Sequence, residues 1–175
     1  RAAIDCGLLH VYRCDQPYWH ASKAKNTAHM CASEDILVNL DGDNMLGVDF
    51  PVHVVQQFEV DRCTVAQYED GEGTCGRIAC RREDFCNIRG YDEDCYPMGA
   101  QDVDLVMRLR QLPGAFFRKV RGSPHSQAIH NSQALKVCCC SPVYGGLRWG
   151  QMDTLNRDIF KWRREDGQIQ RNLDR

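Results

Sequence analysis

The sequence predicts an α/β fold, and three observations lead to this prediction. Residues 36–40 form an apolar run with strand character that ends in the turn Asp41-Gly42-Asp43. A helix signal follows this turn, because Asp49 and Pro51 are typical of a helix cap and a first helical turn. Further along the chain, strand and helix patterns alternate, which is the order of elements in α/β proteins.

Length and charge limit the classes of protein to consider. The 175 residues are of single-domain length, so we expect one domain over residues 1–175. The formal net charge is -2 and the arginines are dispersed among acidic neighbours, which gives no reason to expect nucleic acid as a partner. No apolar stretch approaches the roughly 20 residues of a membrane-spanning helix, so we expect no membrane contact from this segment.

The start of the chain and its cysteines bear on its extent and compartment. The chain begins with Arg1, and a strand-like stretch follows at residues 7–12, so we expect upstream sequence to be absent and the domain to be partial. The eleven cysteines are odd in number and form no C-x-x-C pair. Two alternatives stay open: a Golgi or secretory lumen with some disulfides, or a cytoplasmic protein with cysteines as small buried hydrophobic residues.

We expect two amphipathic helices in the first half of the chain. The first is capped by Ser22 and precedes the strand at residues 36–40, and the second begins at Pro51. Their apolar faces are formed by Ala24, Ala28 and Cys31 in the first helix and by Val52, Val55 and Phe58 in the second.

The second half continues with shorter elements and then two longer helices. The glycine-rich stretch 69–76 predicts a surface turn, which a short strand at 77–80 and one helical turn at 82–85 follow. A helix over 101–112, stopped by Pro113-Gly114, precedes a strand at 116–120. The apolar faces are Leu105, Leu109 and Leu112 in this helix and Leu155, Ile159 and Trp162 in a final helix from Met152 onward.

The turn Asp41-Gly42-Asp43 is the first candidate site. In open α/β sheets, ligands bind outside the carboxyl ends of the strands, which is where these carboxylates lie. Hard oxygen ligands suit Mg²⁺ or Mn²⁺ rather than Zn²⁺, and both ions share their coordination shell with substrate phosphates. The alternative is a solvated turn in which the two carboxylates merely cap Asn44 and its neighbours.

Asp102 is the second candidate, at the start of the predicted helix 101–112. The unpaired backbone N–H groups and the helix dipole favour an ionised carboxylate there, which is the form that accepts a proton. The alternative is a capping aspartate without a catalytic role.

Three segments, in this order, resemble nucleotide-sugar glycosyltransferases of the GT-A fold: Asp41-Gly42-Asp43, Ile88-Arg89-Gly90-Tyr91-Asp92-Glu93, and Gly99-Ala100-Gln101-Asp102-Val103-Asp104-Leu105 followed by Arg108-Leu109. The chain is most similar to the C-terminal catalytic part of inverting enzymes, the β-1,4-galactosyltransferases and the chondroitin-type N-acetylgalactosaminyltransferases. The resemblance covers about residues 20–135. It implies a GT-A-like mixed sheet flanked by helices that lacks part of the N-terminal nucleotide-binding half, on the order of 60 residues.

The resemblance implies a metal-dependent hexosyltransferase. It would move a hexose or N-acetylhexosamine from a nucleoside diphosphate sugar, such as a UDP-sugar, to a saccharide hydroxyl with inversion. Asp43 would bind Mn²⁺ or Mg²⁺, Asp41 would reach the ion or donor hydroxyls, and the ion would neutralise the leaving diphosphate. His130 would be a third ligand, with His125 as its competitor, and Asp102 would take the proton from the acceptor hydroxyl.

Further residues match the family in the donor and acceptor sites. Gly90 permits close approach, and Tyr91 offers a face for a pyranose ring. The donor site would include Lys25, Asn26, Asp41 and Gly90, and the acceptor site Tyr91, Asp92 and Gln101. Lys25 also fits a solvated helix lysine. Gln101 departs from the family, which has a glutamate before the catalytic aspartate, so the residue keeps its hydrogen-bonding reach but loses the charge.

Two other functions compete with the transferase. The first is a non-catalytic carbohydrate-binding protein derived from such an enzyme, which would release no UDP from a nucleotide sugar. The second is a metal-dependent phosphohydrolase, against which the lack of further aspartate and histidine clusters in the sequence counts.

Overall fold

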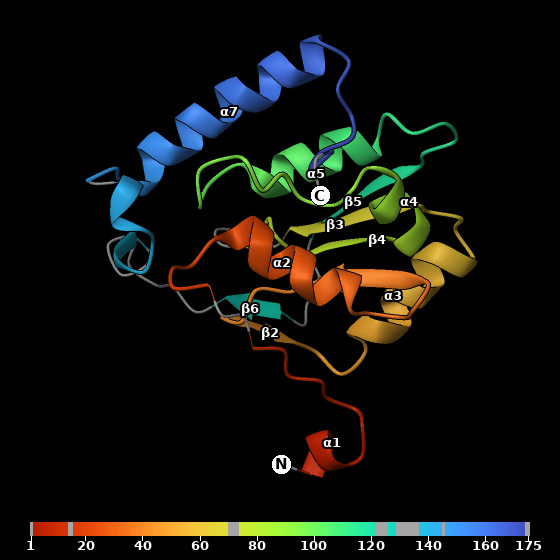
Figure 1. Ribbon diagram of the computed structural model, residues 1–175. Helices are drawn as coiled ribbons and strands as arrows, with labels where there is room; N and C mark the ends of the chain where they lie inside the picture. Colours follow the sequence, from red (N-terminus) through yellow and green to blue (C-terminus); the bar gives the residue numbers. More distant parts are fainter. Residues whose placement is uncertain are drawn as a thin grey trace.

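The structure is a computed structural model that describes residues 2–13, 16–69, 74–121, 126–128, 137–144 and 146–173 (Figure 1). The helices are α1 (Ala2–Asp5), α2 (Ala21–Met30), α3 (Phe50–Glu59), α4 (Arg82–Asn87), α5 (Gln101–Leu109), the 3₁₀ turn η1 (Pro142–Tyr144) and α7 (Trp149–Glu165). The strands are β1 (Ile36–Asn39), β2 (Asn44–Leu46), β3 (Val65–Glu69), β4 (Ile78–Arg81), β5 (Phe117–Arg121) and β6 (Ser126–Ala128). None of the helices in these ranges is long and apolar enough to cross a membrane.

The main sheet is mixed and has the strand order β1-β4-β3-β5. β4 runs antiparallel to both β1 and β3, whereas β3 and β5 are parallel. It follows that β1, β3 and β5 point in the same direction and end at the same edge of the sheet. The α/β class with a mixed sheet flanked by helices is therefore confirmed. β2 and β6 form a separate antiparallel pair, with Asn44 opposite Ala128.

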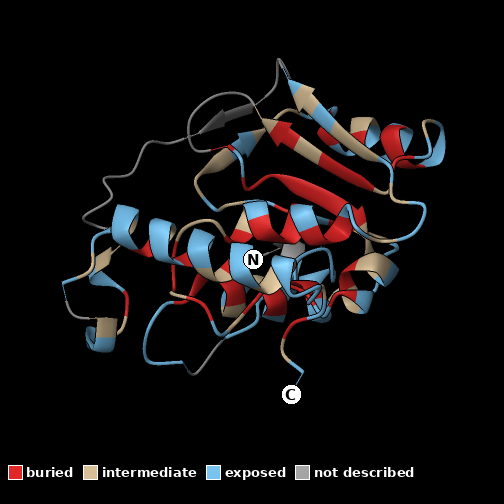
Figure 2. Ribbon diagram, turned by 90° about the horizontal axis from the view of Figure 1, so that it is seen from above, coloured by how far each residue is buried: buried red, intermediate tan, exposed pale blue. Residues whose placement is uncertain are grey.

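Helices cover both faces of this sheet, and an apolar core lies on each face. Neighbouring strand residues point to opposite faces, and Val65 lies in one core while Ala66 lies in the other. The first core is closed by α4 and α5 and the second by α3, which leaves β3 and β4 largely buried (Figure 2). Cys80 and Cys63 are buried in the two cores as thiols.

Most predicted elements are confirmed, including α3, β4, α4, α5, β5 and α7. The strand predicted at residues 7–12 is wrong, because this segment is exposed and, together with α1, projects away from the sheet (Figure 1). The central strand β3 was not predicted. Val65 and Tyr68 are its only large apolar residues, so its pattern is a weak strand signal.

The faces of two predicted helices are wrong, and both errors have the same physical cause. Helix α2 exposes the predicted apolar face and buries Ala21, Ser22, Asn26 and His29 instead. Helix α7 buries Met152, Asn156 and Phe160 instead of the predicted Leu155, Ile159 and Trp162. Each buried face includes an asparagine, Asn26 in α2 and Asn156 in α7, whose side chain hydrogen-bonds to another segment.

The face predicted for α3 is wrong in part. Phe58 is buried as expected, but Val52 and Val55 are exposed and Phe50 and Val54 take their place against the sheet.

Helix α7 packs on the segment that leads into α5. Gly99 has φ +91°, and a β-carbon built there would lie 2.6 Å from the Cα of Asp153 in α7. Ala100, the next residue, also has a left-handed backbone, with φ +62°. The start of α5 is therefore set by a close backbone contact that only glycine allows.

We predict that Gly99→Ala destabilises the protein more than Gly114→Ala does. Both glycines have positive φ, so each alanine costs about 1–2 kcal/mol of backbone strain. A β-carbon at Gly114 meets no atom within 4 Å, whereas at Gly99 it overlaps α7 and adds overpacking on the order of 1–3 kcal/mol. Urea unfolding measures both free energies, and equal losses would show that α7 does not pack on Gly99.

Candidate functional site

Two carboxylates and one ammonium group meet at the edge where β1 ends. Asp41 lies two residues beyond β1, Asp102 is the second residue of α5, and Lys25 is in α2. The Nζ atom of Lys25 lies 2.8 Å from Oδ1 of Asp102 and 3.3 Å from Oδ1 of Asp41. The side chain of Asp41 is 35% exposed and that of Asp102 is 20% exposed. The structure thus brings together Asp41 of the acidic turn, the helix-start carboxylate and the predicted lysine, at a place solvent reaches.

Gly76 gives the two carboxylates the space to lie together. It lies two residues before Ile78, which pairs with Asn39 at the end of β1, and the side chain of Asn39 donates a hydrogen bond of 2.6 Å to the Gly76 carbonyl. A β-carbon at Gly76 would lie 2.5 Å from Oδ2 of Asp41 and 3.1 Å from Oδ2 of Asp102. Gly76 was not predicted as a site residue from the sequence. The only signal in the sequence is a glycine just before a short predicted strand.

Lys25 remains charged between its two partners. Burial alone would lower the pKa of its ammonium group, but the carboxylates of Asp102 and Asp41 outweigh that effect and raise the pKa above its ordinary value. Lys25 is therefore a fixed cation of the site.

Tyr91 is a hydrogen-bond donor to the site. Its side chain is fully buried, and its hydroxyl donates to Oδ1 of Asp102 over 3.3 Å. Burial, and then the negative charge of Asp102, raise the pKa of the phenol well above its ordinary value, so it keeps its proton. Its ring lies 5.3 Å from Nζ of Lys25 and has no exposed face on which a pyranose could stack.

Asn26 and Gly90, both matched to the donor site, shape the backbone around Tyr91. The amide of Asn26 accepts a hydrogen bond from the Tyr91 backbone N–H at 2.8 Å and donates one to its carbonyl at 2.9 Å. Gly90 has φ +69°, and a β-carbon there would lie 2.5 Å from Oδ1 of Asn26. A larger residue at position 90 would therefore break the contact between Asn26 and Tyr91.

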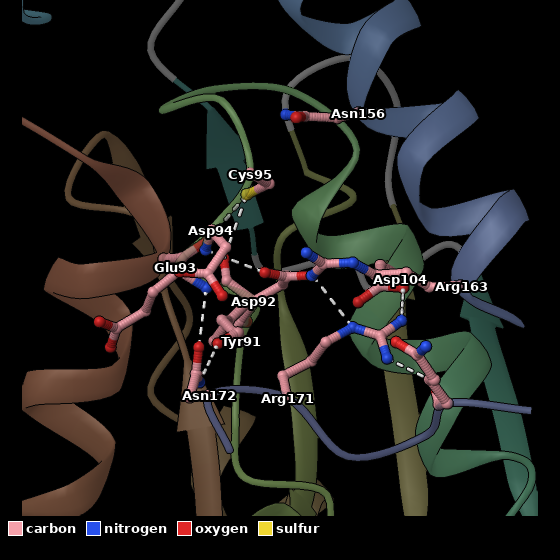
Figure 3. A network of polar contacts seen from close by, with 12 residues as sticks. Tyr91, Asp92, Glu93, Asp94, Cys95, Asp104, Asn156, Arg163, Arg171 and Asn172 are labelled. Atoms are coloured by element: carbon pink, nitrogen blue, oxygen red, sulfur yellow. Dashed lines mark hydrogen bonds and ion pairs between the residues drawn. The ribbon is translucent and has the colours of Figure 1, made fainter. Parts of the chain in front are cut away.

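Asp92 and Gln101, both matched to the acceptor site, are buried and bound to other protein groups. The carboxylate of Asp92 is fully buried and forms ion pairs with Arg163 and Arg171 (Figure 3). Gln101 is 5% exposed and donates a hydrogen bond of 3.1 Å to the carbonyl of Tyr96. In this structure neither side chain presents a surface to an acceptor sugar.

The metal-binding prediction rests on Asp41 and Asp43. Asp43 is half-buried in the same turn, and its Oδ1 accepts a hydrogen bond of 2.8 Å from the Asn44 side chain. Within the described ranges, no three histidine, cysteine, aspartate or glutamate residues are grouped to hold a metal ion. His130 and its competitor His125 lie outside the described residues. Asp41 and Asp43, two residues apart in the chain, have the oxygen ligands that Mg²⁺ or Mn²⁺ prefers.

The chain matches no known family model, no curated protein and no solved structure. The site must therefore be interpreted from its own geometry. That geometry combines a partly exposed acidic turn, a fixed cation, and a carboxylate whose Oδ1 accepts hydrogen bonds from Lys25 and Tyr91. Such a site can bind an anionic group at the lysine and accept a proton at the carboxylate.

His29, on the same helix as Lys25, is a buried titratable residue next to Tyr91. It is 8% exposed, stacks on Phe85 with ring centroids 4.9 Å apart, and its Nδ1 lies 2.8 Å from the carbonyl of Lys25. Since a carbonyl only accepts, Nδ1 carries the proton of the neutral ring. Burial, and more weakly the charge of Lys25, lower the pKa of His29 below its ordinary value.

We predict that the protein loses stability as the pH falls below about 6.5, the ordinary pKa of histidine, and that His29→Phe reduces this loss. Below this pH, His29 is protonated in the unfolded state but stays neutral in the folded state. Its contribution to the free energy of unfolding is therefore present above about pH 6.5, the ordinary histidine pKa, and is lost as the pH falls below that value. Phenylalanine keeps the stacked ring but does not titrate.

The measurement compares free energies of unfolding in urea at pH 8.0 and pH 5.5. The matched control is His10→Phe, because His10 is exposed. His20 is also buried with a lowered pKa, so part of the pH dependence should survive in His29→Phe. An unchanged pH dependence in His29→Phe would contradict the prediction.

Proposed function

We propose that this protein is a metal-dependent inverting glycosyltransferase. It would transfer a hexose or N-acetylhexosamine from a nucleoside diphosphate sugar, such as a UDP-sugar, to a saccharide hydroxyl. One observation carries the proposal: Asp41 of the acidic turn and Asp102 of the helix start share the ammonium group of Lys25 and both lie over Gly76. A candidate residue for binding the donor and the candidate base for the acceptor hydroxyl therefore lie next to each other.

Asp102 is the proposed general base. It would take the proton of the acceptor hydroxyl as that oxygen attacks the anomeric carbon. Lys25 and Tyr91 both donate hydrogen bonds to its Oδ1, which orient the carboxylate, and Oδ2 would accept the proton. The position in the first turn of α5 adds the favourable field of the helix N-terminus.

Lys25, Asp41 and Asp43 are the proposed donor groups. Asp41 and Asp43 would hold Mn²⁺ or Mg²⁺, which when bound neutralises charge on the diphosphate leaving group. Lys25, whose raised pKa keeps it cationic, would bind a phosphate oxygen of the donor. Since Lys25 pairs with both carboxylates in the structure, binding of the donor would redistribute these contacts.

A second candidate function is a non-catalytic carbohydrate-binding protein. The observation that favours it is Gln101, which replaces the glutamate of the family and is buried against the carbonyl of Tyr96. A protein of this kind would bind saccharide but release no UDP above background from nucleotide sugars in the presence of Mn²⁺. Measured release of UDP that depends on a saccharide acceptor separates the two functions.

We predict that Asp43→Ala abolishes Mn²⁺-dependent binding of a UDP-sugar, because it removes one of two carboxylates available to the ion. Isothermal titration calorimetry with UDP-galactose and with UDP-N-acetylgalactosamine, each with and without Mn²⁺, measures this. Asp158→Ala, at an exposed position in α7, is the matched control and should bind as the wild type does. Unchanged affinity in Asp43→Ala would remove the metal site from the proposal.

We predict that Asp102→Asn retains binding of the donor but slows transfer by roughly 10²- to 10⁴-fold, the usual contribution of a general base. The amide has nearly the shape of the carboxylate but cannot take the proton. Initial rates of UDP release with a saccharide acceptor give kcat, and calorimetry gives donor affinity. Turnover at the wild-type level would exclude Asp102 as the base.

A further inference from the structure

The loop of residues 88–100, between α4 and α5, contains Tyr91 and leads to Asp102, yet it forms no helix or strand. Buried backbone groups need hydrogen-bond partners, and in this loop the side-chain amides of three asparagines bind several of them. Asn26 comes from α2, Asn156 from α7 and Asn172 from the C-terminal segment. The conformation of the loop is therefore imposed by elements that are distant in sequence.

Asn156 binds the second half of this loop. Its side chain accepts a hydrogen bond of 2.8 Å from the Tyr96 N–H. It donates to the carbonyls of Tyr96, Met98 and Gly99 over 3.1, 3.0 and 2.8 Å. Asn156 is fully buried, so its role in holding the entry to α5 is structural.

Asn172 binds the first half, around Tyr91. Its amide nitrogen donates to the carbonyls of Arg89 and Tyr91, each over 2.9 Å, and its Oδ1 accepts from the Glu93 N–H at 3.1 Å. The Tyr91 carbonyl thus accepts from both Asn172 and Asn26. The backbone of Tyr91 is fixed by two amides.

We call residues 168–173 the C-terminal strap, because further contacts fasten this segment to the same loop. The N–H of Arg171 donates to the carbonyl of Ile88, and Arg89 donates to the carbonyls of Asn172 and Leu173. Arg171 also lies between two buried carboxylates, 3.0 Å from Asp92 and 3.4 Å from Asp104 (Figure 3). Because Asp104 belongs to α5, the strap joins the loop to the helix that carries Asp102.

We infer that Asn172 is a positioning residue for the proposed general base, acting through Tyr91. The inference rests on the proposed function. The hydroxyl of Tyr91 reaches Oδ1 of Asp102 over 3.3 Å, which is long for an O–H donor, so a small shift of the Tyr91 backbone removes the bond. The ring is packed among buried side chains and cannot compensate by rotation.

Asn172→Gly is the diagnostic variant. Asn172 has φ +52°, which glycine adopts without strain, so this change removes the amide alone. Arg171 is less suitable, because its removal leaves buried carboxylates uncompensated and destabilises the fold. The matched control is Gln170→Ala, which deletes a strap hydrogen bond to the carbonyl of Asn87, away from Tyr91.

The first measurement needs no activity. The ¹³Cζ resonance of Tyr91, assigned by its loss in Tyr91→Phe, reports on the hydrogen bond of the phenol. We expect Asn172→Gly to move this resonance in the same direction as Asp102→Ala and to speed amide exchange at Glu93, while Gln170→Ala changes neither. A Tyr91 resonance at its wild-type position in Asn172→Gly would overturn the inference, whether or not the protein is a transferase.

The second measurement is a double-mutant cycle on transfer. Loss of one hydrogen bond to a charged group predicts a fall in kcat of about 10-fold in Asn172→Gly and in Tyr91→Phe, with donor affinity unchanged. Since both changes break the same link, the double variant should fall no further. Additive losses, or a wild-type kcat in Asn172→Gly, would overturn the inference. Absence of UDP release in the wild type would instead refute the proposed function and leave the resonance measurement to decide.

Discussion

The ammonium group of Lys25 is the contact on which the candidate site depends. Two carboxylates near one another repel and raise the energy of the ionised pair, yet Asp41 and Asp102 both lie over the bare backbone of Gly76. Lys25 offsets that repulsion by lying within 3.3 Å of each. It also joins three elements, the end of β1, the middle of α2 and the start of α5. Attraction between Lys25 and the two carboxylates, together with the surrounding fold, thus keeps these three side chains close to one another.

Behind this contact is a second, fully buried set of charges whose function is geometric. Asp92 and Asp104 pair with Arg171, and Asp104 also accepts from Arg108 at 2.7 Å. Buried ion pairs are weak evidence of net stability, because desolvation opposes their attraction, but losing one partner costs about 3–5 kcal/mol. Such a network tolerates few alternative arrangements. It fixes the loop of residues 88–100 and the C-terminal strap against helix α5, which carries Asp102.

The sequence was informative where apolar periodicity or a short motif carries the signal. The turn Asp41-Gly42-Asp43 after a strand and the leucine stripe of α5 were predicted, and so was the α/β class. What could not be predicted depends on contacts between distant segments. Gly76 matters only because β4 pairs with β1, and Asp92 is an internal ion partner only because Arg171 returns to it from the end of the chain. Neither relation leaves a local pattern in the sequence.

The wrong helix faces and the asparagine contacts have a common origin. Asparagine is a poor helix former, by up to about 0.7 kcal/mol relative to alanine, and it interrupts an apolar stripe. A periodicity argument therefore assigns Asn26 and Asn156 to solvent, yet both are buried. A side-chain amide donates and accepts at once, so it can bind the N–H and C=O groups of a loop whose left-handed residues prevent regular structure. A buried asparagine within a helix is thus better interpreted as a contact to an irregular segment, and in this chain that segment leads to the proposed base.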